Sequence, residues 1–85
     1  MKKDKIILII IKLLEKRGSI NLKKKQAIED YNFFKNGHID SVGLIKFIFE
    51  LETKFKVNLS IEETSNKNFA TIKGLANIIL KELKK

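Results

Sequence analysis

The segment Gly37–Leu44 holds the residues best suited to chemistry, because a serine follows an acidic residue there where a loop gives way to a helix. A helix N-terminus carries unpaired amide groups and the positive end of the helix dipole, which together favour a phosphate group. The Ser41 hydroxyl is therefore suited to a phosphodiester, and Asp40 is placed to cap the helix. An Asp-Ser pair at a helix start is common, so the pair alone does not identify a site.

Two other kinds of site are disfavoured. His38, Asp40 and Ser41 lie within four residues of one another, which makes the geometry of a catalytic triad hard to achieve. The chain has one His and no Cys, which leaves little for metal binding and excludes a disulfide. We therefore expect no metal site, and we interpret His38 as a loop residue beside an attached group.

Helical segments must position Ser41. Apolar residues recur at helical spacing, and no strand alternation or internal repeat appears. The pattern predicts an all-α fold, a small bundle of three main helices plus a short third helix, forming a single domain over residues 1–85. The expected helices cover about residues 4–17, 41–55 and 72–83, with the short one starting after the capping-box serine Ser60 and Thr71 capping the last.

The connection between the first two long helices is irregular. Residues 23–30 are expected to form a turn or two of helix, and Asn36-Gly37 is a turn signal. We expect Tyr31, Phe33 and Phe34 to anchor this connection on the core. A connection of this length is uncommon in so small a domain, and function is one common reason for it.

The helix after Ser41 is apolar on most of its circumference. Its expected stripe includes Val42, Ile45, Ile48, Phe49 and Phe55, widened by Leu44, Phe47 and Leu51. Four apolar residues could line a cargo pocket or contact partners, although an ordinary core position is expected for most of them: Val42, Ile45, Phe49 and Ile61. We expect Val42 and Ile61 to be the partner contacts. Lys46 is either a solvated residue or a charge that selects partners.

The formal net charge is +8, which raises nucleic acid or an anionic membrane as a partner. The lysines are scattered, and the densest cluster, Lys23-Lys24-Lys25, is interpreted as solvated surface. The apolar run from Ile6 to Ile11 is too short for a membrane span and lacks a signal-peptide cleavage site. We expect a buried helix there, no membrane span and a cytoplasmic protein.

Three stretches form a wider pattern around the serine. They are Phe34-x-x-Gly37-x-Ile39-Asp40-Ser41-Val42, Leu51-Glu52-x-x-Phe55-x-Val57-x-Leu59 and Asn68-Phe69-x-Thr71-Ile72. From about residue 31 to residue 80, the chain resembles the acyl carrier protein family, the phosphopantetheine-attachment domains. The Asp-Ser-Leu motif of that family stands here as Asp40-Ser41-Val42. The sequence is closer to stand-alone specialised carriers, D-alanyl carriers among them, than to the fatty-acid type.

The resemblance implies a function. A phosphopantetheinyl transferase would move 4′-phosphopantetheine from coenzyme A to Ser41, with Asp40 as part of the recognised motif. The thiol of the arm would carry an acyl or aminoacyl group as a thioester, and the protein itself would not be an enzyme. Further partners would be an acyl or aminoacyl ligase and a downstream transferase or synthase, in lipid or secondary-metabolite biosynthesis.

The chain also departs from the family pattern. Fatty-acid carriers are typically acidic along this helix, but here Lys46 and Gly43 replace two expected acidic residues, while Glu50 and Glu52 remain. A basic chain is steered poorly toward positively charged enzymes. We therefore expect dedicated partners with different surfaces.

Two other functions remain as alternatives. A basic helical nucleic-acid-binding module would use the cluster Lys23-Lys24-Lys25. We expect no nucleic-acid partner, because Phe47, Phe49 and Phe55 are assigned to the core stripe rather than to base stacking. A structural or toxin-associated interaction domain would leave Ser41 unmodified.

Overall fold

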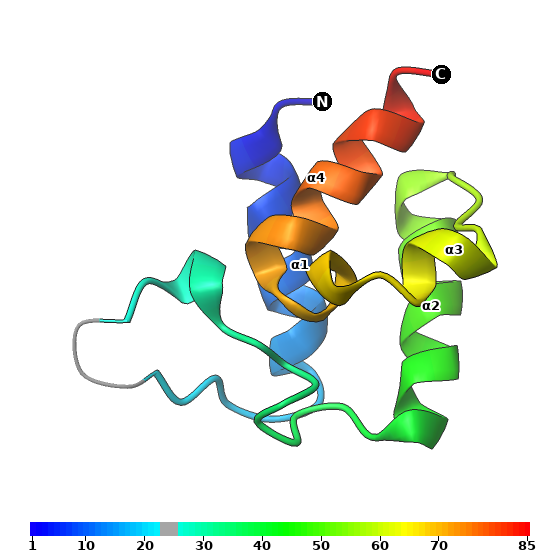
Figure 1. Ribbon diagram of the computed structural model, residues 1–85. Coiled ribbons are helices and arrows are strands. Elements are labelled where there is room, and N and C mark those ends of the chain that lie inside the picture. The colour runs from blue at the N-terminus through cyan, green and yellow to red at the C-terminus, as the bar shows by residue number, and fades with distance from the viewer. Residues whose placement is uncertain (23–25) are drawn as a thin grey trace.

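The protein is a small helical bundle in the computed structural model, which describes residues 1–22 and 26–85 (Figure 1). Its elements are the long helices α1 (Lys3–Glu15), α2 (Ser41–Phe55) and α4 (Ile72–Leu83), the short helix α3 (Ile61–Thr64), and the 3-10 turns η1 (Ile28–Asp30) and η2 (Lys67–Ala70). Within the described ranges no strand forms, and extended pairing is limited to the isolated bridge between Asn32 and Thr71. The predicted all-α bundle with three main helices and a short third helix is confirmed.

Helix α1 follows the predicted pattern closely. Ile6, Ile10 and Leu14 are fully buried, and Leu13 is nearly so. The helix ends at Glu15, two residues before the predicted end, and Gly18 with a φ of 143° turns the chain away. Leu8 remains exposed, because it lies on the side opposite the core. No helix of the described part of the chain combines the length and apolar character needed to cross a bilayer.

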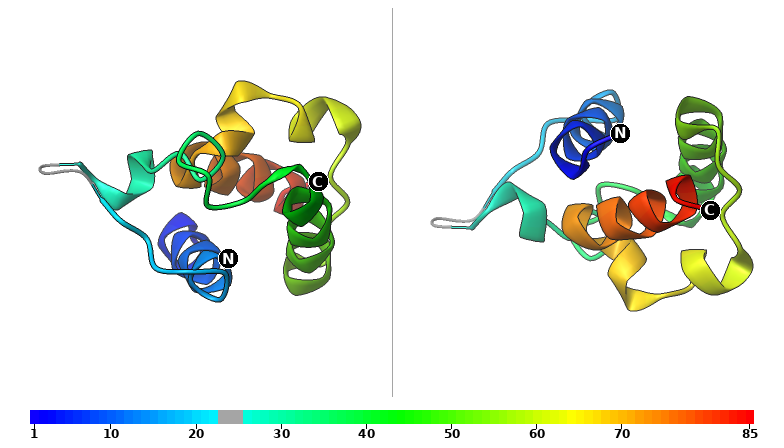
Figure 2. Two further views of the ribbon diagram at one scale, coloured as in Figure 1. Left: turned by 90° about the horizontal axis from the view of Figure 1, so that it is seen from below. Right: turned by 90° about the horizontal axis from the view of Figure 1, so that it is seen from above.

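The core is formed chiefly between α1 and α4, which lie side by side in Figures 1 and 2. Three aromatic rings extend it toward α2. The Phe33 ring packs edge-on against Phe47 with a centroid distance of 5.5 Å, and against Phe69 at 6.4 Å. These rings come from the irregular connection, from α2 and from η2, so their contacts join these three segments.

The connection before α2 is held by backbone hydrogen bonds as well as by side chains. The Phe33 amide donates to the Ala70 carbonyl at 3.0 Å, and the Ile72 amide donates to the Tyr31 carbonyl at 3.3 Å. Tyr31 and Phe33 are buried, as predicted. The prediction for Phe34 was wrong, since this side chain is 45% exposed and lies beyond the paired stretch. The predicted helix over residues 23–30 is reduced to η1 in its described part, and Lys23-Lys24-Lys25 lie outside the described residues.

Helix α2 spans its predicted residues, but only part of its predicted apolar surface meets the core. Phe47, Leu51 and Phe55 are buried, and Leu44 and Ile48 pack beside them, all at helical spacing. Three other residues of the predicted stripe point to solvent: Val42, which was also expected to contact partners, and Ile45 and Phe49, for which a core position was expected. The physical reason is that α2 lies at the edge of the bundle and therefore has neighbours along one side (Figure 2). A helix in this position buries one stripe, and the competing stripe stays exposed.

The last two helices start as predicted. At α3 the Ser60 hydroxyl accepts from the Glu63 amide at 3.1 Å, while the Glu63 carboxylate accepts from the Ser60 amide at 3.0 Å. At α4 the Thr71 hydroxyl accepts from the Gly74 amide at 3.0 Å. Gly74 has a packing role, because a Cβ there would lie 1.8 Å from the Asn68 carbonyl oxygen of η2. The close approach of η2 to α4 therefore requires glycine.

Candidate functional site

Asp40 caps helix α2 as predicted. Its backbone is extended, with φ −87° and ψ −179°, and its Oδ1 accepts from the Gly43 amide at 2.7 Å. The Leu44 amide donates to the Asp40 backbone carbonyl at 2.8 Å, which closes the first turn of the helix. Asp40 thus fixes where α2 begins and which residue occupies its first position.

Ser41 is that first residue, and it is exposed to solvent. Among the hydrogen bonds of the described residues, none engages the amides of Ser41 and Val42. These amides remain available beside the hydroxyl at the positive end of α2. The hydroxyl is therefore accessible to a modifying enzyme, and its surroundings suit a phosphate diester attached to it.

The loop before Ser41 is organised by two asparagines and a glycine. The Asn32 side chain accepts from the amides of Phe34 and Lys35, and Asn36 donates from its side chain to the Asn32 carbonyl at 2.8 Å. Gly37 adopts a φ of 72°, as the Asn-Gly turn predicts. The chain then returns to the core at Ile39, which is 2% exposed. Ser41 therefore lies two residues after Ile39, whose buried side chain anchors the loop.

His38 connects this loop to α1 and has no free ring nitrogen. Its Nε2 lies 2.7 Å from the Leu14 carbonyl oxygen, and its Nδ1 lies 2.9 Å from the Tyr31 hydroxyl. A carbonyl only accepts, so Nε2 carries the hydrogen and the Tyr31 hydroxyl donates to Nδ1 in the neutral ring. Burial raises the pKa of Tyr31, which keeps this hydroxyl protonated as a donor. His38 is therefore a structural link, and it is not available as a base for Ser41.

A hollow of about 360 Å³ opens beside the first turns of α2. Its apolar wall includes Phe34, Leu44 and Phe69, and its other wall is formed by polar residues at the end of α3 and in the turn after it. Leu44 stands three residues after Ser41, which is one helical turn. Phe34, which is 45% exposed, lines this hollow and does not join the core.

The three predicted partner contacts Val42, Lys46 and Ile61 are all exposed. Two further apolar side chains, Ile45 and Phe49, are also exposed. The expectation that they would be core residues was wrong. The exposed fractions are 70% for Val42, 60% for Ile45, 63% for Phe49 and 84% for Ile61. Their spacing along α2 contained the signal, since positions 42, 45 and 49 form a second helical stripe beside the buried one.

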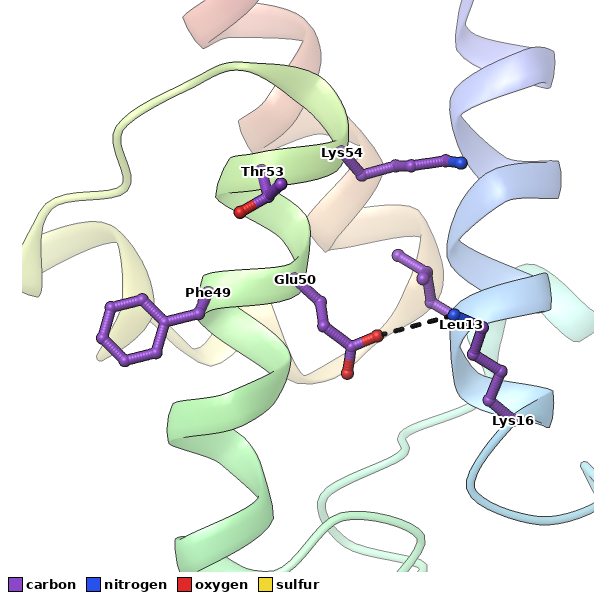
Figure 3. A pocket seen from close by; sticks show the side chains of 6 residues that line it. All are labelled: Leu13, Lys16, Phe49, Glu50, Thr53 and Lys54. Carbon is purple, nitrogen blue, oxygen red and sulfur yellow. Dashed lines mark ion pairs between the residues drawn. The ribbon is translucent and has the colours of Figure 1, made fainter.

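Both acidic residues of α2 are engaged by neighbouring segments. The Glu50 carboxylate is paired with the guanidinium of Arg17. It also lies 4.0 Å from Nζ of Lys16, a pair that Figure 3 marks with a dashed line. The Glu52 carboxylate accepts from the Leu59 amide at 2.9 Å and so holds the loop after α2. Arg17 also lies over the Phe47 ring, at 5.8 Å from its centroid. Neither glutamate is therefore a free negative charge for a partner.

A groove of about 440 Å³ lies between α1 and α2. Leu13 and Lys16 line it from α1, and Phe49, Glu50, Thr53 and Lys54 line it from α2. Figure 3 shows Glu50 and Lys54 directed toward α1, whereas Phe49 points away from it. Phe49 therefore lies at the outer rim of the groove and joins it to the exposed side of α2.

Comparison of the chain with protein-family models, with curated proteins and with solved structures finds no match. A nucleic-acid partner was disfavoured because Phe47, Phe49 and Phe55 were expected in the core. Phe47 and Phe55 are buried, but Phe49 is exposed.

Proposed function

We propose that the protein is a carrier that holds an acyl or aminoacyl group on a 4′-phosphopantetheine arm attached to Ser41. The observation that carries this proposal is an exposed serine at the first position of a long, capped helix, with its neighbouring amides unused. The resemblance of the segment around Asp40-Ser41-Val42 to the carrier family supports it from the sequence side.

Attachment would require little of the protein beyond presentation of the serine. The Ser41 oxygen would attack the pantetheine-side phosphorus of the coenzyme A pyrophosphate, its proton would pass to a base of the transferase, and adenosine 3′,5′-bisphosphate would leave. The arm supplies a thiol that forms thioesters. The residues of this chain position the serine: Asp40 fixes the helix start, and Ile39 and His38 hold the loop.

Catalysis by the chain itself has less support. Both nitrogens of His38 are engaged, and the Asp40 carboxylate caps the helix, so neither is placed to activate Ser41. We therefore propose a non-enzymatic carrier of a specialised pathway. It would work in the cytoplasm with a phosphopantetheinyl transferase, an acyl or aminoacyl ligase and a downstream transferase or synthase.

Intact-mass measurement tests the attachment. Purified protein is incubated with coenzyme A and a broad-specificity phosphopantetheinyl transferase, and a gain of about 340 Da is expected. Ser41→Ala should remove the gain while retaining the helical circular-dichroism spectrum. Ser60→Ala is the matched control, because Ser60 also stands at a helix start, and this variant should still gain the mass.

Two results would contradict the proposal. One is an unmodified wild-type protein after treatment with several such transferases, together with an unmodified protein from its native cells. The other is a mass gain that persists in Ser41→Ala, which would place the attachment elsewhere.

A further inference from the structure

The pair Asn36-Gly37, in the loop before α2, has a chemistry that the proposed function does not use. The side-chain amide carbon of an asparagine, Cγ, is an electrophile, and the backbone nitrogen of the next residue can attack it and close a five-membered ring. A side chain on that next residue crowds the ring, so glycine permits the attack best. Asn36 is the only asparagine of the chain that precedes a glycine. The sequence therefore singles out one position for this reaction.

The structure leaves space for the ring to form. Residues 34–37 are all exposed. A Cβ built on Gly37 would have no described atom within 4 Å other than those of its chain neighbours. The attack and the later entry of water are therefore both unobstructed in this part of the described chain.

Two hydrogen bonds hold the reacting groups in other positions. Nδ2 of Asn36 donates to the Asn32 carbonyl at 2.8 Å, and the Gly37 amide donates to the Phe34 carbonyl at 3.1 Å. The attack requires both groups to leave these partners, so the turn has to open first. Because these bonds are exposed to solvent, the turn opens at a low cost in free energy.

Asn32 is the residue that stabilises the closed turn. Its Oδ1 accepts from the amides of Phe34 and Lys35, at 3.1 Å and 2.7 Å. Its carbonyl accepts from the amide and from the side chain of Asn36, at 3.1 Å and 2.8 Å. Removal of the Asn32 side chain would leave two amides of the turn without their acceptor, and the open form would become more populated.

We propose that Asn36 is a site of spontaneous deamidation, that Asn32 slows this reaction, and that its product alters the loop before α2. The Gly37 nitrogen gives up its proton to a base from the solvent and forms a bond to Cγ of Asn36. The bond from Cγ to Nδ2 breaks, and Nδ2 takes up a proton and leaves as ammonia. Water then adds to one of the two carbonyl carbons of the ring and opens it to aspartate or isoaspartate. Water is the only co-reactant, and no step involves Ser41, so the site is independent of the proposed carrier role.

Both products change the same loop. The side chain at position 36 loses its donor and gains a negative charge, which then faces the Asn32 carbonyl oxygen that it had bonded. In the isoaspartyl product the main chain also passes through Cβ, so it is longer by one carbon atom. The loop closes where the Ile39 amide donates to the Phe33 carbonyl at 3.2 Å, and both of these side chains are buried. The added atom must therefore be accommodated directly before the start of α2.

Ageing of the intact protein tests the site. The protein is kept in a mildly alkaline buffer and digested at intervals, and the peptide that carries Asn36 should gain about 1 Da. Isoaspartate is detected by methylation of its carboxyl with an isoaspartyl methyltransferase and S-adenosylmethionine. Asn66 is the internal control, because it is also exposed and begins a turn but precedes Lys67. Conversion at Asn36 should be at least about tenfold faster than at Asn66, since Lys67 carries a side chain and Gly37 does not.

Two variants test the role of Asn32. Asn32→Ala should speed the conversion by roughly two- to tenfold, the change in an opening equilibrium that follows the loss of a hydrogen bond. Asn32→Asp is the matched control, because it keeps an acceptor oxygen and should retain the wild-type rate. Circular dichroism shows whether each variant is folded, and the comparison of Asn36 with Asn66 in the wild-type protein depends on neither variant.

NMR spectra of the aged protein locate the effect of the products. The amides of residues 38–43 should shift in the converted fraction, while those of α4 beyond its first turn should stay in place. Three results would overturn the inference: conversion at Asn36 no faster than at Asn66, equal rates in Asn32→Ala and Asn32→Asp, or unchanged amides over residues 38–43 after conversion. Loading at Ser41 is not part of these measurements, so their failure leaves the proposed function intact, and failure of loading leaves the deamidation site intact.

Discussion

Helices α1 and α2 are both rich in apolar residues, but they use them differently. Helix α1 (Lys3–Glu15) lies along α4 and buries its main stripe, and Leu8 is the one large apolar side chain of this helix that is exposed. Helix α2 buries Phe47, Leu51 and Phe55 yet leaves three comparable side chains exposed. Burial of an apolar side chain stabilises the fold by roughly 1.5–3 kcal/mol, and exposed ones contribute little of this. The exposed stripe of α2 is therefore better explained by binding than by folding.

The strongest test of this comparison pairs two phenylalanines of α2. Phe47→Ala should lower the free energy of unfolding by about 3–5 kcal/mol, because it leaves a cavity beside Phe33. Phe49→Ala should change it by less than about 0.5 kcal/mol. Urea denaturation followed by circular dichroism measures both. Equal losses would show that Phe49 has a buried role and that the two sides of α2 do not differ.

Substitution of two glycines, Gly74 and Gly43, should give a smaller difference in stability. Gly74→Ala places a methyl group against the backbone of η2 and should cost about 1–3 kcal/mol. Gly43→Ala meets Oδ1 of Asp40 at 3.1 Å, and the better helix propensity of alanine should offset much of that tight contact. Thermal melting of both variants checks the order. A neutral Gly74→Ala would mean that η2 moves away from α4 without loss.

The next largest loss of stability is expected at Asp40, which caps helix α2 beside Ser41. Asp40→Ala removes the acceptor of the Gly43 amide and should destabilise the protein by about 1 kcal/mol. Asp40→Asn keeps a capping oxygen and should restore most of this loss. The same variants, when loaded in the mass assay, separate the capping role of Asp40 from a role in recognition by the transferase. Recognition would be indicated if Asp40→Asn were stable but loaded slowly.

The smallest effect concerns α3, which carries the exposed residue Ile61. The Ser60 amide bonded to the Glu63 carboxylate lowers the pKa of that carboxyl below its ordinary value of 4.5. A lowered pKa in the folded state contributes stability above the ordinary value, and this contribution is lost as the pH falls through the lowered pKa. Denaturation between pH 7 and pH 3 should show this loss, and Glu63→Gln should flatten the dependence. An unchanged slope in Glu63→Gln would exclude Glu63 as its source.

Much of this protein is determined by local sequence. The starts of α2, α3 and α4 were predicted correctly because Asp40, Ser60 and Thr71 bond to amides three residues ahead, and such contacts depend on neighbours along the chain. The Asn36-Gly37 turn and the position of Ser41 at a helix start were predictable for the same reason. The carrier role of that serine stays a prediction.

Tertiary structure decided which side of each helix meets the core. Helix α2 has two apolar stripes of similar size, and its sequence does not state which one faces α1 and α4. The position of α2 at the edge of the bundle buries one stripe, draws Glu50 to Arg17, and leaves Val42, Ile45 and Phe49 in solvent. Likewise, the links from His38 to Leu14 and Tyr31 join residues 24 and 7 positions apart. Local chemistry sets where a helix begins, but burial depends on neighbours that only the folded chain brings together.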